Sequence, residues 1–277
     1  MKKFILSMVL LLACGNAGAS FMEENDLYLE DNHYLSNMTE DQFDNVVNRI
    51  QKYLGPVSEN TGMPLKILGH WEDSTVNAYA YVRNGVRYVE IFGGLARRPE
   101  VTRDALALVL CHEVGHHLGG FPKYDGQWAA DEGQSDYYST LACSKLLWGN
   151  QKKQNKKAKR EIPKYPRKQC NSVWFWNSER DLCYRSMLAG KSLADLLSRS
   201  GDVDYSTKDD NLVEETQHSH PDAQCRLDTY MAGALCTARW NHTMIPETEY
   251  DAYSVSCPMD EYVFGWRPRC WFKPEEK

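Results

Sequence analysis

The sequence predicts an α+β fold in which a small sheet forms early in the chain and a mostly helical body follows. Short apolar stretches at 65–71, 76–83 and 86–92 have the composition of strands, and Asn84-Gly85 is a favoured hairpin turn between the last two. A long segment with helical spacing follows from about 99 to 118. Of the nine cysteines, Cys14 lies near the N-terminus and seven of the other eight lie beyond residue 118, which predicts a disulfide-rich C-terminal half.

The first 19 residues have the features of a signal peptide. Lys2 and Lys3 precede a short apolar run at 4–13, and the small residues at 17–19 form a cleavage site before Ser20. Residues 11–14 (Leu-Leu-Ala-Cys) also resemble a bacterial lipobox, which would place a lipid on Cys14. Both alternatives predict export, to the bacterial periplasm or as an outer-membrane lipoprotein, and release into the medium is the weaker expectation. Residues 20–277 are then expected to form a single domain.

The composition of the chain narrows the class of protein. Hydrophobic residues make up 42% of the 277 positions, which is enough for a sizeable core. The net charge of −6 is spread along the chain and forms no basic face, so nucleic-acid binding is not expected. After the signal peptide no segment approaches the run of about 20 apolar residues that a membrane-spanning helix needs, so no such helix is expected in the mature chain.

Helical patterns flank and follow the expected strands. Thr39 and Gln42 form a capping box, and the helix that they begin is expected to end at Gly55-Pro56. Pro99 suits the first turn of the long helix, which is apolar on most sides and therefore expected to be central and buried. Further helices are expected at about 128–147, 192–197 and 221–238.

Two features of the C-terminal half concern surface and covalent structure. Residues 151–168 are rich in lysine and arginine, so we expect a solvated surface insertion; a docking site for an acidic partner is the alternative. Spacing alone does not fix the disulfide pairing, and Cys170–Cys183 and Cys257–Cys270 are the local pairs that we expect. No pair of C-x-x-C motifs is present, which disfavours a zinc site made of cysteines.

The motif His112-Glu113-Val114-Gly115-His116 lies within the long helix. Residues four apart share a helix face, so the two histidines are expected to bind one zinc ion. Glu113 would lie beside the metal, where its carboxylate can take a proton from the attacking water and pass it to the leaving amine. Gly115 is costly inside a helix, which suggests that another element packs closely there. The alternative, two core histidines without a metal, is disfavoured by the buried helix of an exported chain.

Glu132 is expected to be the third zinc ligand. The metzincin pattern fails because Pro122 stands where it requires a histidine. The gluzincin pattern needs a glutamate on a later helix and an acid four residues on; Glu132 and Asp136 satisfy it, and Asp136 would accept a hydrogen bond from a ligand histidine. Asp131 is the rival ligand, whereas His117 points about 100° away from the ligand face. Three protein ligands leave one position for water, as in catalytic zinc sites.

These motifs resemble the HtpX and CAAX prenyl protease family of zinc metallopeptidases, in a soluble, exported branch. The matching segments, in order between about 65 and 240, are Asn77-Ala78-Tyr79-Ala80 with 88–94, His112 to His116, Glu132 with Asp136, and His220-Pro221 with Arg226. The basic segment at 151–168 and the cysteines depart from the family pattern, and the membrane helices of other members are missing.

The resemblance implies a zincin-like fold, with a small sheet packed on the two zinc-ligand helices and a protein or peptide substrate bound as an extra strand along the sheet edge. It also implies that His220 or Arg226 lies near the active site, where either would steady the oxyanion or gate the zinc. The alternative is a surface turn at 218–220 and a structural ion pair for Arg226.

The sequence therefore predicts a zinc-dependent endopeptidase, with one zinc ion per chain, that hydrolyses proteins of the cell envelope; the resemblance suggests quality control as its setting. An alternative of another class is an envelope binding or assembly factor with structural zinc, whose aromatic, disulfide-rich tail is the interaction surface. A third is a secreted degradative protease. The sequence makes no prediction of the oligomeric state.

Overall fold

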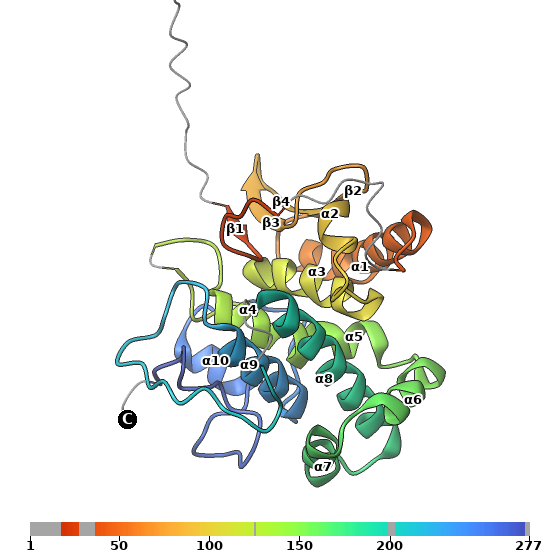
Figure 1. Cartoon of the computed structure of the whole chain (residues 1–277). Helices are drawn as coiled ribbons and strands as arrows, with labels where there is room; N and C mark the ends of the chain where they lie inside the picture. The colour runs from red at the N-terminus through yellow and green to blue at the C-terminus, as the bar shows by residue number, and fades with distance from the viewer. Residues whose placement is uncertain (1–17, 28–36, 125, 199–202, 275–277) are drawn as a thin grey trace, which may run out of the picture.

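A four-stranded mixed sheet lies over a largely helical body (Figure 1), so the predicted α+β class is confirmed. The computed structural model describes residues 18–27, 37–124, 126–198 and 203–274. The basic and apolar parts of the expected signal peptide, and Cys14 with its lipobox, lie outside these ranges. Within them no helix is both long and apolar enough to cross a membrane.

The sheet has the strand order β1-β3-β4-β2. Strands β3 (Ala78–Arg83) and β4 (Val86–Phe92) form the predicted antiparallel hairpin, and β2 (Leu65–His70) runs parallel to β4. Asn84 and Gly85 have positive φ values of 51° and 71°, which the turn requires. The inward face carries small and branched side chains that are fully buried, Ala78, Ala80, Val89 and Ile91.

Strand β1 (Ala19–Ser20) was not predicted, because these residues span the end of the expected signal peptide. It pairs antiparallel with β3, with Ala19 opposite Ala80 and Ser20 opposite Tyr79. The described fold therefore includes Gly18 and Ala19, which we had assigned to the signal peptide.

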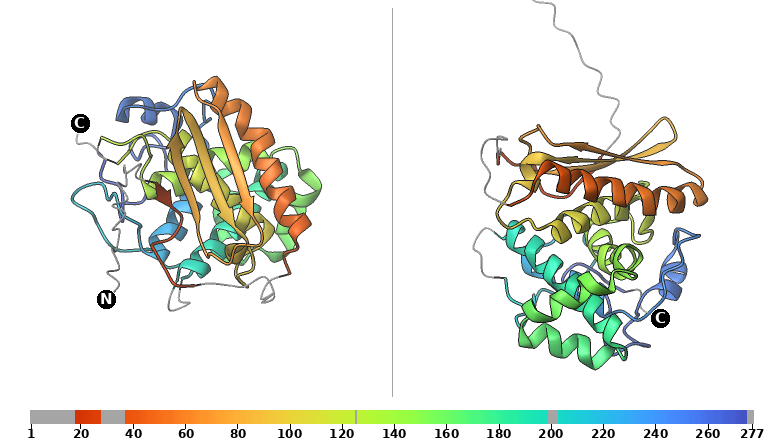
Figure 2. Two further views of the ribbon diagram at one scale, coloured as in Figure 1. Left: turned by 90° about the horizontal axis from the view of Figure 1, so that it is seen from above. Right: turned by 90° about the vertical axis from the view of Figure 1, so that its right-hand side faces the viewer.

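Helix α1 (Glu40–Asn60) lies along the sheet, as the two views in Figure 2 show. Its predicted capping box is present, but Gly55-Pro56 does not end the helix. Pro56 is exposed, so its missing N–H leaves a carbonyl group that water can satisfy, and Ser58 is still buried against the core. The helix ends at Asn60 instead.

Helix α3 (Arg103–Leu118) is the central helix beneath the sheet, as predicted. It begins four residues later than expected, because the hydroxyl of Thr102 accepts a hydrogen bond from the amide of Ala105 and caps it at 3.1 Å. The short helix α2 (Gly93–Ala96) joins β4 to this region. All residues of α3 from Ala105 to Leu118 are buried.

The helices below α3 bring distant parts of the chain together. The run expected at 128–147 consists of α4 (Glu132–Tyr138), a π-helical segment η1 (Ser139–Cys143) and α5 (Ser144–Trp148). Helix α9 (Ala223–Leu235) packs against α4, η1 and α8. Helix α8 (Asn177–Leu197) is far longer than the 192–197 that we predicted, and α10 (Glu249–Val255) lies in the tail.

The basic segment is folded into two helices, which the sequence analysis did not predict. It forms α6 (Lys152–Glu161) and α7 (Lys164–Val173), and both pack on α8. Widely spaced buried side chains, Ala158, Ile162 and Cys170, hold them there, while the lysines face outward. Ala158 and Cys170 lie on α6 and α7, and Ile162 directly follows α6, so a few buried side chains are enough to hold both helices.

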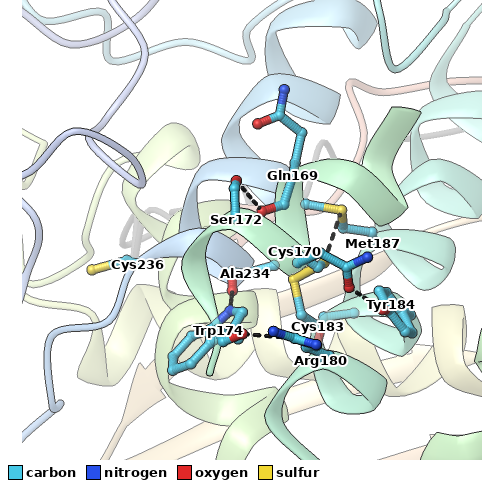
Figure 3. Close-up of a disulfide and its surroundings, with 12 residues drawn as sticks. Gln169, Cys170, Ser172, Trp174, Arg180, Cys183, Tyr184, Met187, Ala234 and Cys236 are labelled. Atoms are coloured by element: carbon cyan, nitrogen blue, oxygen red, sulfur yellow. Dashed lines mark hydrogen bonds between the residues drawn. A yellow bond between two sulfur atoms is a disulfide. The ribbon is translucent and has the colours of Figure 1, made fainter. Parts of the chain in front are cut away.

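Four disulfide bonds link the eight cysteines of the described chain, as the even count predicted. Cys170–Cys183 joins α7 to α8 (Figure 3), where Trp174 donates to the carbonyl of Ala234 at 3.1 Å and Arg180 donates to the carbonyl of Trp174. The expected pair Cys257–Cys270 is wrong: Cys270 is bonded to Cys225 in α9, and Cys257 is bonded to Cys236, which directly follows α9. The other pairs are Cys111–Cys143, Cys225–Cys270 and Cys236–Cys257.

Candidate metal centre

His112 and His116 lie on one face of α3 and are almost completely buried, with exposed fractions of 0% and 1%. Their Nε2 atoms are 3.1 Å apart. The Nδ1 atom of His112 donates to Asp136, and the Nδ1 atom of His116 donates to the carbonyl oxygen of Ala130, each at 2.7 Å. Because these acceptors have no proton to give, each imidazole in its neutral form carries its proton on Nδ1. Both Nε2 lone pairs are then available at a common point.

Glu132, at the start of α4, brings a carboxylate to the same point. Its Oε2 lies 3.1 Å from Nε2 of His112, and its Oε1 lies 3.6 Å from Nε2 of His116. Ligands at about 2.0–2.2 Å from a tetrahedral zinc ion are separated by roughly 3.3–3.5 Å. The three residues therefore fit a zinc ion in both donor type and spacing. The hydroxyl of Tyr124 donates to Glu132 Oε1 at 2.8 Å and orients the carboxylate.

Gly115 explains how α4 approaches α3 so closely. A Cβ atom at this position would lie only 2.9 Å from the Cα atom of Ser135, so a larger residue would push the two helices apart. The expectation that Gly115 allows close packing is therefore confirmed. Asp131, the rival ligand, instead accepts a hydrogen bond from Nδ1 of His218 at 2.8 Å.

Asp136 and Arg226 form a buried ion pair behind His112. Nε of Arg226 lies 2.6 Å from Oδ2 of Asp136, and its Nη2 lies 2.8 Å from Oδ1. Burial would raise the pKa of Asp136, but Arg226 and His112 outweigh it and hold the pKa below its usual value. Asp136 is thus ionised and fixes the ring of His112. The alternative role expected of Arg226 from the sequence was a structural ion pair. Arg226 does form an ion pair, and its partner is Asp136 of the candidate site.

His220 lies in the loop before α9 and reaches the same centre. Its Nε2 is 3.4 Å from Oε2 of Glu132 and donates to the carbonyl oxygen of Ser20 at 2.8 Å. Only 21% of the His220 side chain is exposed. His220 therefore lies against the candidate site and is not part of a remote surface turn. Because a carbonyl oxygen only accepts, this Nε2 carries a proton and does not offer a lone pair.

Glu113 has a carboxylate that is fully buried, and neither of its oxygens has a hydrogen-bond partner among the described residues. One of them lies within 4.8 Å of ring nitrogens of both His112 and His116. Burial raises the pKa of Glu113 to about 8. A buried, unpaired carboxylate is costly, and a raised pKa beside potential metal ligands is typical of a general base. Glu132 lies nearer to the nitrogens, which makes it the better candidate for the third ligand.

The electrostatics of the two histidines differ. Burial alone would lower the pKa of His112, but the carboxylates of Asp136 and Glu132 raise it to about 9. Burial lowers the pKa of His116 to about 4, since its Nδ1 faces a neutral carbonyl group. His117 points elsewhere, as expected: its Nε2 donates to the carbonyl oxygen of Tyr88 at 2.9 Å.

Several residues of this centre were missed by the sequence reasoning. Tyr124 lies in an irregular loop with no motif, and His218 was only part of an expected surface turn. Asn77 was noted as part of a family segment, without a role for its side chain. Ser20 and Phe21 directly follow the expected signal peptide, and nothing else in the sequence indicates that they lie near the site.

Comparisons with known proteins found no relative of this chain: no family model, no curated protein and no solved structure matches it.

Proposed function

We propose that the protein is a zinc-dependent endopeptidase. One observation carries the proposal: the two Nε2 atoms and the Glu132 carboxylate converge, and the unpaired carboxylate of Glu113 lies beside them in a buried site. A purely structural zinc site would not need Glu113, whose burial destabilises the fold. His112, His116 and Glu132 would hold the ion, with one zinc per chain.

When bound, zinc would supply a Lewis acid that lowers the pKa of water and polarises a peptide carbonyl. Glu113 takes the proton of the attacking water and passes it to the leaving amine, a role to which a pKa of about 8 is suited near neutral pH. Nε2 of His220, which donates to the carbonyl oxygen of Ser20 in the structure, would donate in the same way to the carbonyl oxygen of a bound substrate and stabilise the negative charge that develops there. Asp136 keeps the ring of His112 in place, and Arg226 keeps Asp136 ionised.

The arrangement of elements supports a zincin-like fold and a substrate bound along the sheet. Strand β3 forms the outer edge of the β3–β4 hairpin, and along this edge it pairs with β1, whose Ser20 carbonyl accepts a hydrogen bond from His220 of the candidate site. An extended peptide that pairs with this edge would place its backbone between the sheet and α9. Disulfide bonds fit an oxidising compartment, and the resemblance to HtpX and CAAX prenyl proteases favours proteins of the bacterial cell envelope as substrates.

The second candidate is an envelope binding or assembly factor with zinc in a structural role. It is favoured by the closeness of His220 to Glu132, since a fourth protein group near the ion could exclude water. The hydrogen bond from Nε2 of His220 to the carbonyl oxygen of Ser20 weighs against this candidate, because a nitrogen that carries a proton cannot bind the ion.

The test measures bound zinc and casein cleavage in the parent chain and in Glu113→Gln, with Glu59→Gln on the exposed end of α1 as the matched control. One zinc per chain in all three, with cleavage lost only in Glu113→Gln, would support the peptidase. Zinc in all three without cleavage by any would favour the binding role. A chain that takes up no zinc would contradict both.

A further inference from the structure

The segment Gly18–Met22 lies along the sheet edge that the proposed substrate would use. Strand β1 pairs antiparallel with β3, and the amide of Phe21 donates to the carbonyl of Ala78 at 3.1 Å. The side chain of Asn77 continues this row of hydrogen bonds to the next residue of the segment, Met22. Its Oδ1 accepts from the amide of Met22 at 3.0 Å, and its Nδ2 donates to the carbonyl of Met22 at 3.1 Å.

The opposite side of this segment faces the residues of the candidate site. His220 donates to the carbonyl of Ser20, and Nη1 of Arg226 donates to the carbonyl of Phe21, each at 2.8 Å. Two consecutive carbonyl groups are therefore held by the two side chains that the sequence placed near the metal. All of these contacts are made to main-chain atoms, so any extended peptide of similar course could make them.

One side chain of the segment is recognised in its own right. Phe21 is fully buried, with its ring edge-to-face against His112 at a centroid distance of 5.3 Å. The guanidinium of Arg226 lies 4.7 Å from the same ring. The pocket that Phe21 fills is thus bounded by a candidate zinc ligand and by the arginine that supports it, and it suits an aromatic ring.

We infer that residues Gly18–Met22 are a tethered peptide that occupies the substrate cleft and competes with substrate, and that the cleft selects an extended peptide with an aromatic residue in the Phe21 pocket. The inference rests on the proposed function, because it names the substrate class and the regulation of the same site. A tethered ligand acts at an effective concentration in the millimolar range, so a weakly binding strand is enough to restrain the enzyme. Cleavage before Ser20 by signal peptidase would leave Ser20, Phe21 and Met22 in place.

The test releases the segment after folding. A recognition site for a specific protease is inserted after Leu27, which is exposed and lies five residues beyond Met22, and the folded protein is cut there. Because folding precedes the cut, the result does not depend on whether a truncated chain can fold. The binding probe is the capped peptide Gly-Ala-Ser-Phe-Met with a fluorescent label, and the control probe replaces its phenylalanine with alanine.

We expect the cut protein, freed of its fragment by gel filtration, to bind the phenylalanine peptide at least tenfold more tightly than the uncut protein does. The alanine peptide should bind at least tenfold more weakly. Casein cleavage should rise at least fivefold on cutting and fall again when the phenylalanine peptide is added. A Phe21→Ala chain should reproduce the gain without cutting, and Leu27→Ala should not.

Equal binding of both peptides, or equal binding before and after cutting, would overturn the inference even if casein is cleaved. Peptide binding that follows the expected pattern without any cleavage would instead retain the tethered ligand and contradict the peptidase. Mass spectrometry of the uncut chain shows whether the protein cleaves its own segment. A chain cut by itself between Ser20 and Phe21 would make the segment a substrate and refute its role as an inhibitor.

Discussion

Replacement of Glu113 by glutamine should stabilise the metal-free protein while it abolishes proteolysis. The carboxylate is fully buried and has no hydrogen-bond partner in the described chain, and its pKa is raised from 4.5 to about 8. Each pKa unit corresponds to about 1.4 kcal/mol of differential stability, so the full interval amounts to about 5 kcal/mol. This is an upper bound, because water that enters the metal-free cleft reduces it. Glutamine keeps the shape of the side chain without the charge.

The pH dependence of this gain has a definite sign. Well below pH 4.5 the carboxyl group is protonated in both the folded and the unfolded chain, so the two proteins should be equally stable. Between pH 4.5 and about 8 the folded parent binds more protons than the unfolded parent, and its stability falls as the pH rises. The advantage of Glu113→Gln should therefore grow across this window and level off above about pH 8. His112 and Glu132, which face Glu113, are present in both proteins.

Urea denaturation with excess chelator measures this difference at pH 4.5, 6 and 8, and Glu59→Gln on the exposed end of α1 serves as the control. An advantage of about 2–5 kcal/mol at pH 8 that nearly vanishes at pH 4.5 would agree with an unpaired buried base. With zinc present, casein cleavage should fall about 10²–10⁴-fold, the usual contribution of a general base. A variant that is less stable than the parent at pH 8 would show that the Glu113 carboxylate is paired, and would refute the reasoning.

Three further changes test the framework of the site. Asp136→Asn leaves the buried guanidinium of Arg226 without its carboxylate, so zinc affinity measured by chelator competition should drop about 10–100-fold, and an unchanged affinity would remove Asp136 from the site. Gly115→Ala should destabilise the fold by about 1–3 kcal/mol in urea denaturation because the added methyl group meets α4, and a neutral effect would contradict the close approach. The double variant Cys170→Ser, Cys183→Ser should lose about 3 kcal/mol, as expected for a loop with a sequence separation of 13, and an unchanged unfolding midpoint would show that the bond does not constrain the chain.

The parts of the fold that were predictable depend on neighbouring residues. The turn at Asn84-Gly85 is fixed by local backbone preference, and the capping box at Thr39 and Gln42 needs only three residues of spacing. The same holds for His112 and His116, because four residues of α-helix place both on one face whatever surrounds them. The geometry of this pair could therefore be expected before any tertiary structure was known.

Features that depend on tertiary packing escaped the sequence. Pro56 continues a helix because its ring faces solvent, which the local pattern does not reveal. The basic segment folds because a few buried side chains meet α8, and the lysines around them conceal the pattern. His220 and Ser20 are 200 residues apart, so no local signal connects them.

The site is assembled by packing rather than by one motif, and a disulfide bond links the elements that carry its donor residues. Cys111 precedes His112 in α3, and its partner Cys143 ends η1, which directly continues α4, the helix of Glu132. The bond therefore ties the helix of the two histidines to the helical run that carries the third candidate ligand. Gly115 lets those helices touch, and Asp136 fixes the ring of His112 from the other side. Each of these constraints is made by the protein chain itself, so they reduce the free energy that metal binding must spend on ordering the donor residues.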